Sequence, residues 1–260
     1  MGGRKILVLL HSRENALACV DFVAHLFRDV KLLLVIGFVY EGPEDPVGLE
    51  TQRKAITRDL QQAYNAHPNI RLMVRNGRIL SVDDIARESR YTDLIVMEAG
   101  TLDRSLSLKV KRVSNKSETE RLHVPVIIVP EAAQEVEEVI ITFDGQNPSV
   151  TSIKQFCQIM GNVCSDMQVT LLELNHNKAQ FLPQEEKLLI EYLRGHCQNL
   201  GIYKVSEESP QQILQLINSS KNAIVVAGTV DTLQASLGKL PQLSNQLIQQ
   251  NNLPGFFGAS

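Results

Sequence analysis

The chain contains no tryptophan, and only 5% of its 260 residues are aromatic. Proteins that bind single-stranded nucleic acid stack bases on aromatic rings, and most nucleic-acid-binding domains carry a strongly basic face. Here the formal net charge is −3; residues 1–132 are nearly balanced, and the remainder is acidic. Both shortages argue against nucleic acid as the partner.

Long apolar runs are also absent. The longest, around LLLVIGFVY, is roughly half of the ~18 to 20 residues that a membrane span needs. The start, MGGRKILVLL, has a basic beginning but a short apolar segment and no small-residue cleavage site. We therefore expect no membrane partner, no export and a cytoplasmic location.

Cysteine and histidine are few and are not arranged as metal ligands. No C-x-x-C pair occurs, and no two histidines stand at the spacing that builds a metal face on one helix. The four cysteines lie among apolar residues, which is typical of reduced core positions: Cys19, Cys157, Cys164 and Cys197. Because the P-loop, G-x-S-x-G and H-E-x-x-H motifs are missing too, no metal and no catalytic residue is expected from motifs.

The sequence does contain an internal repeat, in which one pattern of residues occurs twice. KILVLLHSREN and EVIITFDGQNP are both β-rich runs that end in a polar turn, and His11 and Asp144 occupy corresponding positions about 130 residues apart. An amphipathic helical pattern follows each run, and further strand and helix patterns then recur with nearly the same offset. Near the end of the first copy, Ser81 and Asp84 have the spacing of a helix capping box.

Each copy therefore reads as βαβαβαβαβ. Strands that alternate with helices at this spacing predict a parallel sheet with helices on both faces, that is, a doubly wound α/β fold. We expect two tandem domains of this kind, one over residues 1–132 and the other over residues 133–260, joined through a short acidic linker.

The strand KILVLL with its polar turn, the segment DLIVM and the segment HVPVIIV, in this order, resemble the universal stress protein family. The resemblance extends over nearly the whole chain, in two tandem copies. It implies Rossmann-like domains and a non-enzymatic role in stress response or regulation. Family members that bind ATP share an acidic residue after the first strand, which meets the adenine. They also share G-x-x-G, nine residues, then G-[ST] after the fourth strand, which holds the phosphates.

In the first copy every one of these positions is changed. His11 stands in place of the acidic residue, Glu98 and Thr101 replace the first two glycines, and Lys111 and Arg112 replace the final pair. A carboxylate about 4 Å from a phosphate oxygen is repelled by about 4 kcal/mol at an effective dielectric constant near 20. The resemblance therefore implies that the first copy has lost ATP binding, and no cofactor is expected there.

The second copy keeps half of the motif. Asp144 and Gly145 match the start of the family pattern, and Gly228, followed by Thr229, matches the first phosphate-loop glycine, whereas Asp231 replaces the next one. Two interpretations stay open: these residues bind AMP, ATP or another small phosphorylated ligand, or Asp144 is only a turn or helix-cap residue.

A third hypothesis uses the changed residues themselves. His11, Ser12 and Glu98 would meet at one edge of the sheet, as in a hydrolase, with backbone N–H groups near Gly100 as oxyanion donors. The alternative is that His11 merely fills the crevice once occupied by the nucleotide.

The last apolar segments of the two copies, Val124 to Val129 and Leu253 to Gly258, are the expected interface. In the family the last strands pair across a dimer, and an apolar edge strand needs a partner to avoid aggregation. We therefore expect these segments to pack together, either within the chain as a pseudo-dimer or across a homodimer.

Overall fold

The computed structural model describes residues 3–39, 46–75, 79–99, 122–131, 135–164, 167–175, 183–206, 222–230 and 252–259. Strands and helices alternate along most of these residues. The elements are β1 (Arg4–Leu10), α1 (Arg13–Leu26), β2 (Leu32–Phe38), α2 (Pro46–Tyr64), β3 (Ile70–Val74), α3 (Val82–Ser89), β4 (Leu94–Glu98), β5 (Val126–Val129), β6 (Glu138–Phe143), α6 (Asn147–Cys164), β7 (Gln168–Asn175), α7 (Pro183–Arg194), β8 (Asn199–Ser206), β9 (Ala223–Val230) and β10 (Gly255–Ala259).

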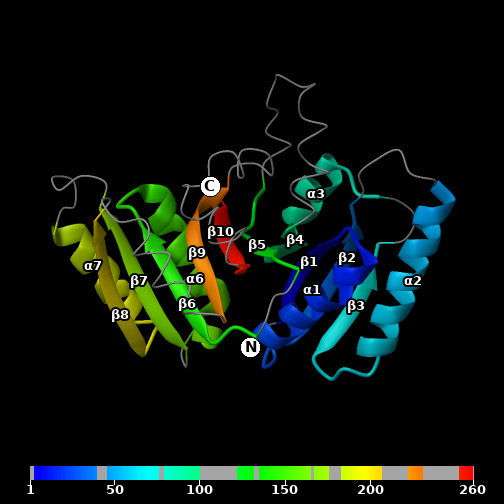
Figure 1. Cartoon of the computed structure of the whole chain (residues 1–260), viewed down its shortest axis with the longest axis horizontal. Helices are drawn as coiled ribbons and strands as arrows, with labels where there is room; N and C mark the ends of the chain where they lie inside the picture. The colour runs from blue at the N-terminus through cyan, green and yellow to red at the C-terminus, as the bar shows by residue number, and fades with distance from the viewer. Residues whose placement is uncertain are drawn as a thin grey trace, which may run out of the picture.

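All described strands belong to one ten-stranded sheet, in the order β3-β2-β1-β4-β5-β10-β9-β6-β7-β8. Within each half of this order neighbouring strands are parallel, whereas β5 and β10, at the centre, run antiparallel. Figure 1 shows the two halves side by side, with β5 and β10 between them. The α/β fold with parallel strands, expected from the sequence, is confirmed.

The central pairing joins the two segments singled out at the ends of the copies. Phe256 lies opposite Ile127, and Gly255 lies opposite Ile128, so the apolar residues of β5 pair with those of β10 inside one chain. On its other side β5 pairs with β4. It is therefore an interior strand in the single chain. Because all ten strands share one sheet, the division into domains at residue 132 stays a prediction.

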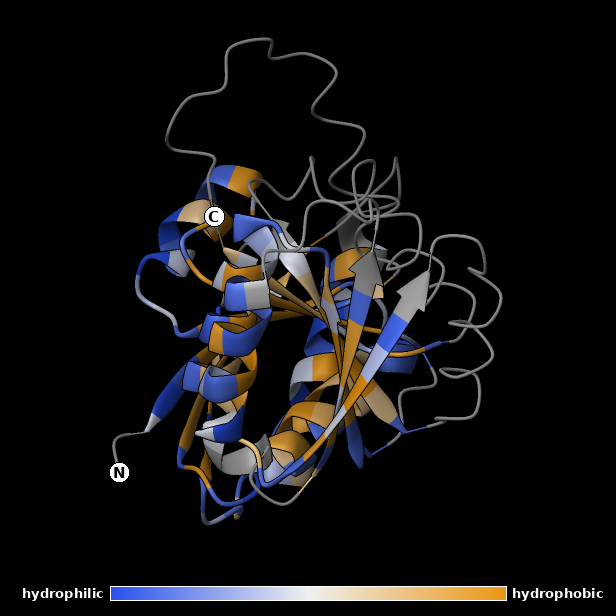
Figure 2. Cartoon of the chain, turned by 90° about the vertical axis from the view of Figure 1, so that its left-hand side faces the viewer, coloured by the Kyte–Doolittle hydropathy of each residue, from blue (hydrophilic) through white to orange (hydrophobic). Residues whose placement is uncertain are grey.

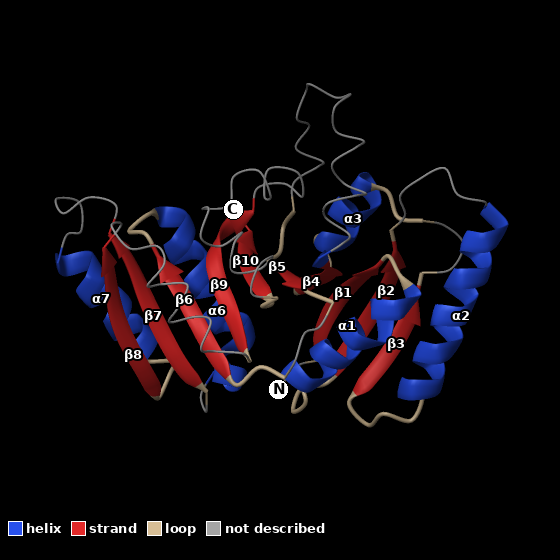
Figure 3. Ribbon diagram, in the orientation of Figure 1, coloured by secondary structure: helices blue, strands red, loops and turns tan. Residues whose placement is uncertain are grey.

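Strand residues are apolar on both faces because helices cover the sheet on both sides. The larger core lies under α1, α2, α6 and α7 and runs without interruption across both halves, from Ile70 to Leu193. The smaller core lies on the opposite face, where Ile85 of α3 packs against Leu7 and Ile95. Figure 2 shows the apolar residues gathered along the strands and on the helix faces that turn toward them, and Figure 3 shows both layers around the sheet.

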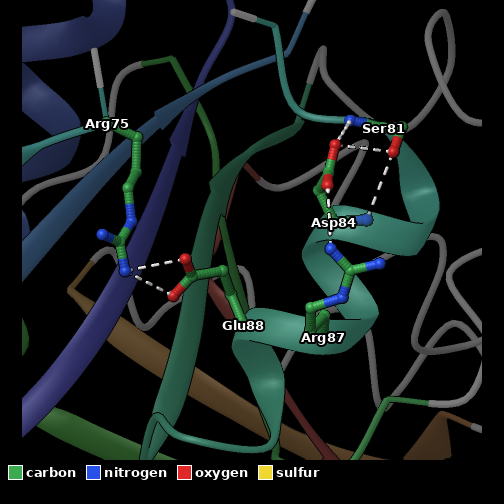
Figure 4. Close-up of polar contacts among 5 residues, drawn as sticks. All are labelled: Arg75, Ser81, Asp84, Arg87 and Glu88. Atoms are coloured by element: carbon green, nitrogen blue, oxygen red, sulfur yellow. Dashed lines mark hydrogen bonds and ion pairs between the residues drawn. The ribbon is translucent and has the colours of Figure 1, made fainter. Parts of the chain in front are cut away.

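The capping box predicted before α3 is confirmed (Figure 4). The Ser81 hydroxyl accepts a hydrogen bond from the Asp84 backbone N–H, and the Asp84 carboxylate accepts one from the Ser81 backbone N–H at 3.1 Å. One turn further along, Arg87 lies 3.7 Å from the Asp84 carboxylate. These contacts satisfy N–H groups that a helix start leaves unpaired.

The end of β10 is held by side chains of α6 as well as by its neighbouring strands. The Gln155 amide accepts from the Ala259 N–H at 2.7 Å and donates to the Ala259 carbonyl at 3.1 Å, as a neighbouring strand would. The buried Ser152 hydroxyl accepts from the Gly258 N–H at 3.0 Å. A side chain at Gly258 would lie 2.7 Å from the Ser152 Cα, so this close approach requires glycine.

Candidate functional site

The candidate residues gather where the strand order reverses. β1 lies between β2 and β4, and β6 lies between β7 and β9, so the chain leaves each central strand at a topological switch point. Ligands of open α/β sheets bind in the crevice outside the carboxyl ends of such strands. His11 and Ser12 follow β1 at this edge, and Asp144 and Gly145 follow β6.

Glu98, the last residue of β4, points its carboxylate at the start of α1. Its Oε1 accepts from the His11 backbone N–H at 3.3 Å, and its Oε2 accepts from the Ser12 hydroxyl at 3.2 Å. Ser12 is also the N-cap of α1, and its hydroxyl accepts from the Asn15 N–H at 3.3 Å. Because a helix start attracts anions, this carboxylate occupies the place where a ligand anion would bind.

The Glu98 side chain is almost fully buried, and only 4% of the residue is exposed. Burial raises the pKa of its carboxyl to about 7, against the opposing effect of the hydrogen bonds from His11 and Ser12; the negative charge of Glu131 raises it further. Glu98 also affects the buried Cys19 of α1. Desolvation is the main cause that raises the pKa of the Cys19 thiol, and the nearby negative charge of Glu98 raises it further.

The structure therefore brings together the three residues of the hydrolase hypothesis. The serine hydroxyl meets the Glu98 carboxylate, and His11 contributes its backbone N–H. The imidazole Nδ1 of His11 is buried and has no hydrogen-bond partner among the described residues. Gly100, the expected source of oxyanion donors, lies outside the described residues.

In the second half Asp144 lies directly after β6 and bonds to the start of α6. Its Oδ1 accepts from the Gln146 backbone N–H at 3.0 Å and from the Ser149 hydroxyl. Gly145 adopts a φ of 77°, in the left-handed region that glycine tolerates best. These contacts are those of the turn and cap interpretation of Asp144.

Gly228 and Thr229 lie in β9. Sequence analysis ended the fourth strand before Gly228; the structure continues β9 to Val230, because Thr229 pairs with Gly258 and Val230 with Ala259. The register shifts by one residue at this point, so Gly228 sits at a β-bulge. Among the described residues, a Cβ at Gly228 would meet no atom within 4 Å.

The sheet register puts Gly228 and Glu98 at equivalent places. Met97 lies opposite Leu9, so Glu98 is level with Leu10. Val226 lies opposite Ile141, so Gly228 is level with Phe143. Leu10 and Phe143 each end the central strand of their half. The first crevice thus contains a carboxylate at the place where, in the second, the described part of the chain puts no atom within 4 Å of a Cβ.

One buried acid near the second crevice was not predicted from the sequence. Glu173 of β7 is 4% exposed and lies level with Phe143. Desolvation raises the pKa of its carboxyl, and the charge of Glu186 adds to this, while Lys204 opposes it from 3.5 Å. The only sequence signal was a glutamate inside the apolar run VTLLELN.

Two searches over the described residues gave negative results. They contain no cluster of three or more His, Cys, Asp or Glu side chains that could hold a metal ion. None of their helices is long and apolar enough to cross a membrane.

No protein-family model and no curated protein sequence matches the chain. Solved structures do. A universal stress protein from Archaeoglobus fulgidus DSM 4304 superposes with a TM-score of 0.63 at 14% identity, over 97% of this chain and 98% of that one. A Pseudomonas aeruginosa UCBPP-PA14 protein assigned to the same family superposes with a TM-score of 0.52 at 14% identity, over 98% and 93%.

A third similar structure is the cytoplasmic domain of a prokaryotic cation chloride cotransporter, with a TM-score of 0.50 at 12% identity, over 100% of this chain and 96% of that one. At such identities a structural likeness defines the fold. The chain has the α/β fold of the universal stress proteins along nearly its whole length.

Proposed function

We propose that this is a non-enzymatic, tandem universal stress protein that acts in stress response or regulation and does not bind ATP in its first crevice. One observation carries the proposal. The Glu98 carboxylate already accepts the hydrogen bonds of His11 and Ser12 at the start of α1. In ATP-binding members of the family the position of Glu98 is the first glycine of the phosphate loop, so here a carboxylate of the chain lies where the phosphates would bind.

Electrostatics supports the same conclusion. A phosphate brought to about 4 Å from an ionised Glu98 would be repelled by about 4 kcal/mol per unit charge. Because the pKa of Glu98 is about 7, this repulsion is complete only above neutral pH, where the carboxyl stays ionised. The three buried free cysteines, Cys19, Cys157 and Cys197, agree with a reducing compartment. We therefore place the protein's action in the cytoplasm.

A nucleotide panel tests the proposal by thermal unfolding. A ligand that binds the native state raises the melting temperature by mass action. With millimolar ATP or AMP, we expect no rise in the melting temperature that depends on residues of the first crevice. A shift that survives Gly228→Glu, which closes the second crevice, but disappears in Ser12→Ala would overturn the proposal.

The second candidate function is binding of AMP, ATP or another small phosphorylated molecule by the second half. It is favoured by the open space beside Gly228 and by the left-handed backbone of Gly145. Against it, Asp144 bonds within its own turn, and Thr229 pairs with β10. This function predicts a nucleotide-dependent shift that is lost in Gly228→Glu and kept in Glu98→Gln.

The hydrolase hypothesis is kept as the third candidate because Ser12 and Glu98 are in contact. It predicts turnover of an ester or phosphate substrate that disappears in Ser12→Ala and in His11→Ala alike. If turnover in either variant equals that of the wild type, the residues have no catalytic role.

For the partners, we propose an intramolecular pseudo-dimer through β5 and β10. Ile127 is fully buried between β4 and β10, so the chain supplies the partner that the edge strand needs. A homodimer through the same strands would require β10 to leave its own chain. Light scattering after size-exclusion chromatography should report a monomer, and Ile127→Lys should lower solubility.

A further inference from the structure

The outer edge of β3 is an unoccupied strand edge among the described residues. β3 ends the sheet and pairs only with β2. The Asn69 carbonyl accepts from Leu32 at 2.7 Å, and the Arg75 N–H donates to Ile36 at 2.9 Å, so the odd-numbered residues between them also face β2. Because pairing alternates along a strand, the N–H and C=O groups of residues 70, 72 and 74 face outward.

A groove of about 700 Å³ runs along this edge, between β3 and α2. Figures 1 and 3 show α2 beside β3 at the outer end of the molecule, opposite the end formed by β8. The apolar lining comes from alternate β3 residues, the ones whose backbone faces outward, and the polar lining comes mainly from α2. The lining residues are Arg58, Gln61, Gln62, Tyr64, Asn65, Ile70, Arg71, Leu72 and Val74.

The charge of the groove is one-sided. Two arginines line it, and no carboxylate does. Among the described residues, the acidic partner of Arg58 is Asp59, 3.7 Å away, and that carboxylate is shared with Arg13 at 2.9 Å. By contrast Arg75, just beyond β3, is engaged: its guanidinium donates to Glu88 of α3 at 2.7 and 2.9 Å (Figure 4).

We propose that this edge binds an extended acidic segment of a partner protein by strand addition. The segment pairs its backbone with residues 70, 72 and 74. Because side chains alternate along a strand, carboxylates on one face of the segment meet Arg58 of α2, and those on the other face meet Arg71. Strand addition draws affinity from backbone hydrogen bonds and specificity from alternate side chains, which suits an edge whose outward groups line a basic groove. The groove lies at the outer end of the sheet, apart from both crevices, so this inference does not depend on the proposed function.

The first experiment uses a ten-residue peptide of repeated Glu-Glu-Val-Val, which presents glutamates on both faces of an extended strand. It is added to the full chain and followed by amide chemical shifts. We expect the largest shifts at Ile70, Leu72 and Val74. Two matched peptides separate the contributions: one has lysine in place of glutamate, and the other is N-methylated at alternate residues, which removes the donors of one edge. Both should bind at least tenfold more weakly. Equal binding by either, or no binding at millimolar peptide, overturns the proposal.

The second experiment changes the protein. An exposed ion pair contributes about 0.2 to 1 kcal/mol, so the double variant Arg58→Ala, Arg71→Ala, which removes two pairs, should weaken peptide binding by about twofold to thirtyfold. Arg90→Ala, which changes the exposed C-cap arginine after α3, is the matched control and should bind like the wild type. If an oligouridylate displaces the peptide and binds more tightly, the groove is a nucleic-acid site and the proposal is wrong.

Discussion

The two crevices of the sheet occupy equivalent places and differ most in the residue at the end of the neighbouring strand, which is Glu98 in the first and Gly228 in the second. In the first, Glu98 reaches the start of α1 and takes up the hydrogen bonds of His11 and Ser12. In the second, no described atom lies within 4 Å of a Cβ placed at Gly228. Asp144, directly after β6, accepts hydrogen bonds from the Gln146 N–H and the Ser149 hydroxyl at the start of α6. Both helix starts are thus satisfied by a carboxylate of this chain. The difference is that Glu98 reaches the start of α1 from the neighbouring strand β4 and so fills the first crevice, whereas Asp144 lies between β6 and its own helix.

The largest expected effect comes from placing a lysine at each of the two equivalent positions and comparing the losses of stability. Glu98→Lys places an ammonium group against the donors of His11 and Ser12, in a site with 4% exposure, and should cost about 3 to 5 kcal/mol in the free energy of unfolding. Gly228→Lys is the matched change, and it should cost less than about 1 kcal/mol because its side chain enters open space. Urea denaturation measures both, and equal losses would show that the crevices do not differ as described.

The first crevice should also respond to pH. Because burial raises the pKa of Glu98 from 4.5 to about 7, folding favours the neutral carboxyl. Its contribution to stability is complete below about pH 4.5 and falls as the pH rises to about 7, by at most about 3 kcal/mol. Glu98→Gln should remove this part of the pH dependence in urea titrations between pH 4.5 and 8. Glu14→Gln, an exposed change on α1, should keep the wild-type profile; if Glu98→Gln keeps it too, the carboxyl is not desolvated.

The second crevice should show a smaller effect. Asp144→Ala removes the acceptor of the Gln146 N–H and the Ser149 hydroxyl at the start of α6, which should cost about 1 kcal/mol. In a double-mutant cycle, the variant with both Asp144→Ala and Ser149→Ala should lose less stability than the sum of the two single losses, because the two residues share one contact. Strict additivity would mean that the contact contributes nothing.

The smallest expected effect is that of Gly228→Ala. The new methyl group meets no atom within 4 Å, and alanine loses less backbone entropy than glycine on folding. Stability should stay within about 0.5 kcal/mol of the wild type. A loss above about 2 kcal/mol would contradict the open space. The change in melting temperature on adding nucleotide to this variant shows whether a ligand binds in that space.

Local features could be read from the sequence, and long-range pairing only in part. The capping box of Ser81 and Asp84 was predicted because all its contacts lie within four residues. The pattern of strands and helices also located Glu98 and His11 at the carboxyl edge. It did not show that the carboxylate accepts from the His11 N–H, because that contact depends on how two distant strands align.

The end of β9 shows the same limit. A glycine followed by threonine reads as the start of a loop, yet the structure has both inside a strand. The cause is distant in sequence: β10 pairs with this end, and Gln155 of α6 fixes β10 in turn. The single sheet across both halves depends on the same strand, and no local pattern encodes the direction in which β10 pairs with β5.

The central place of β10 has a consequence for synthesis on a ribosome. β5 is made early, but β10, which covers its free edge, is made only after the whole second half has emerged. Until then the buried residues of β5 form an apolar, unpaired edge of the kind that aggregates. We expect nascent chains that end before β10 to bind chaperones more strongly than complete ones, and release assays on truncated chains would show whether they do.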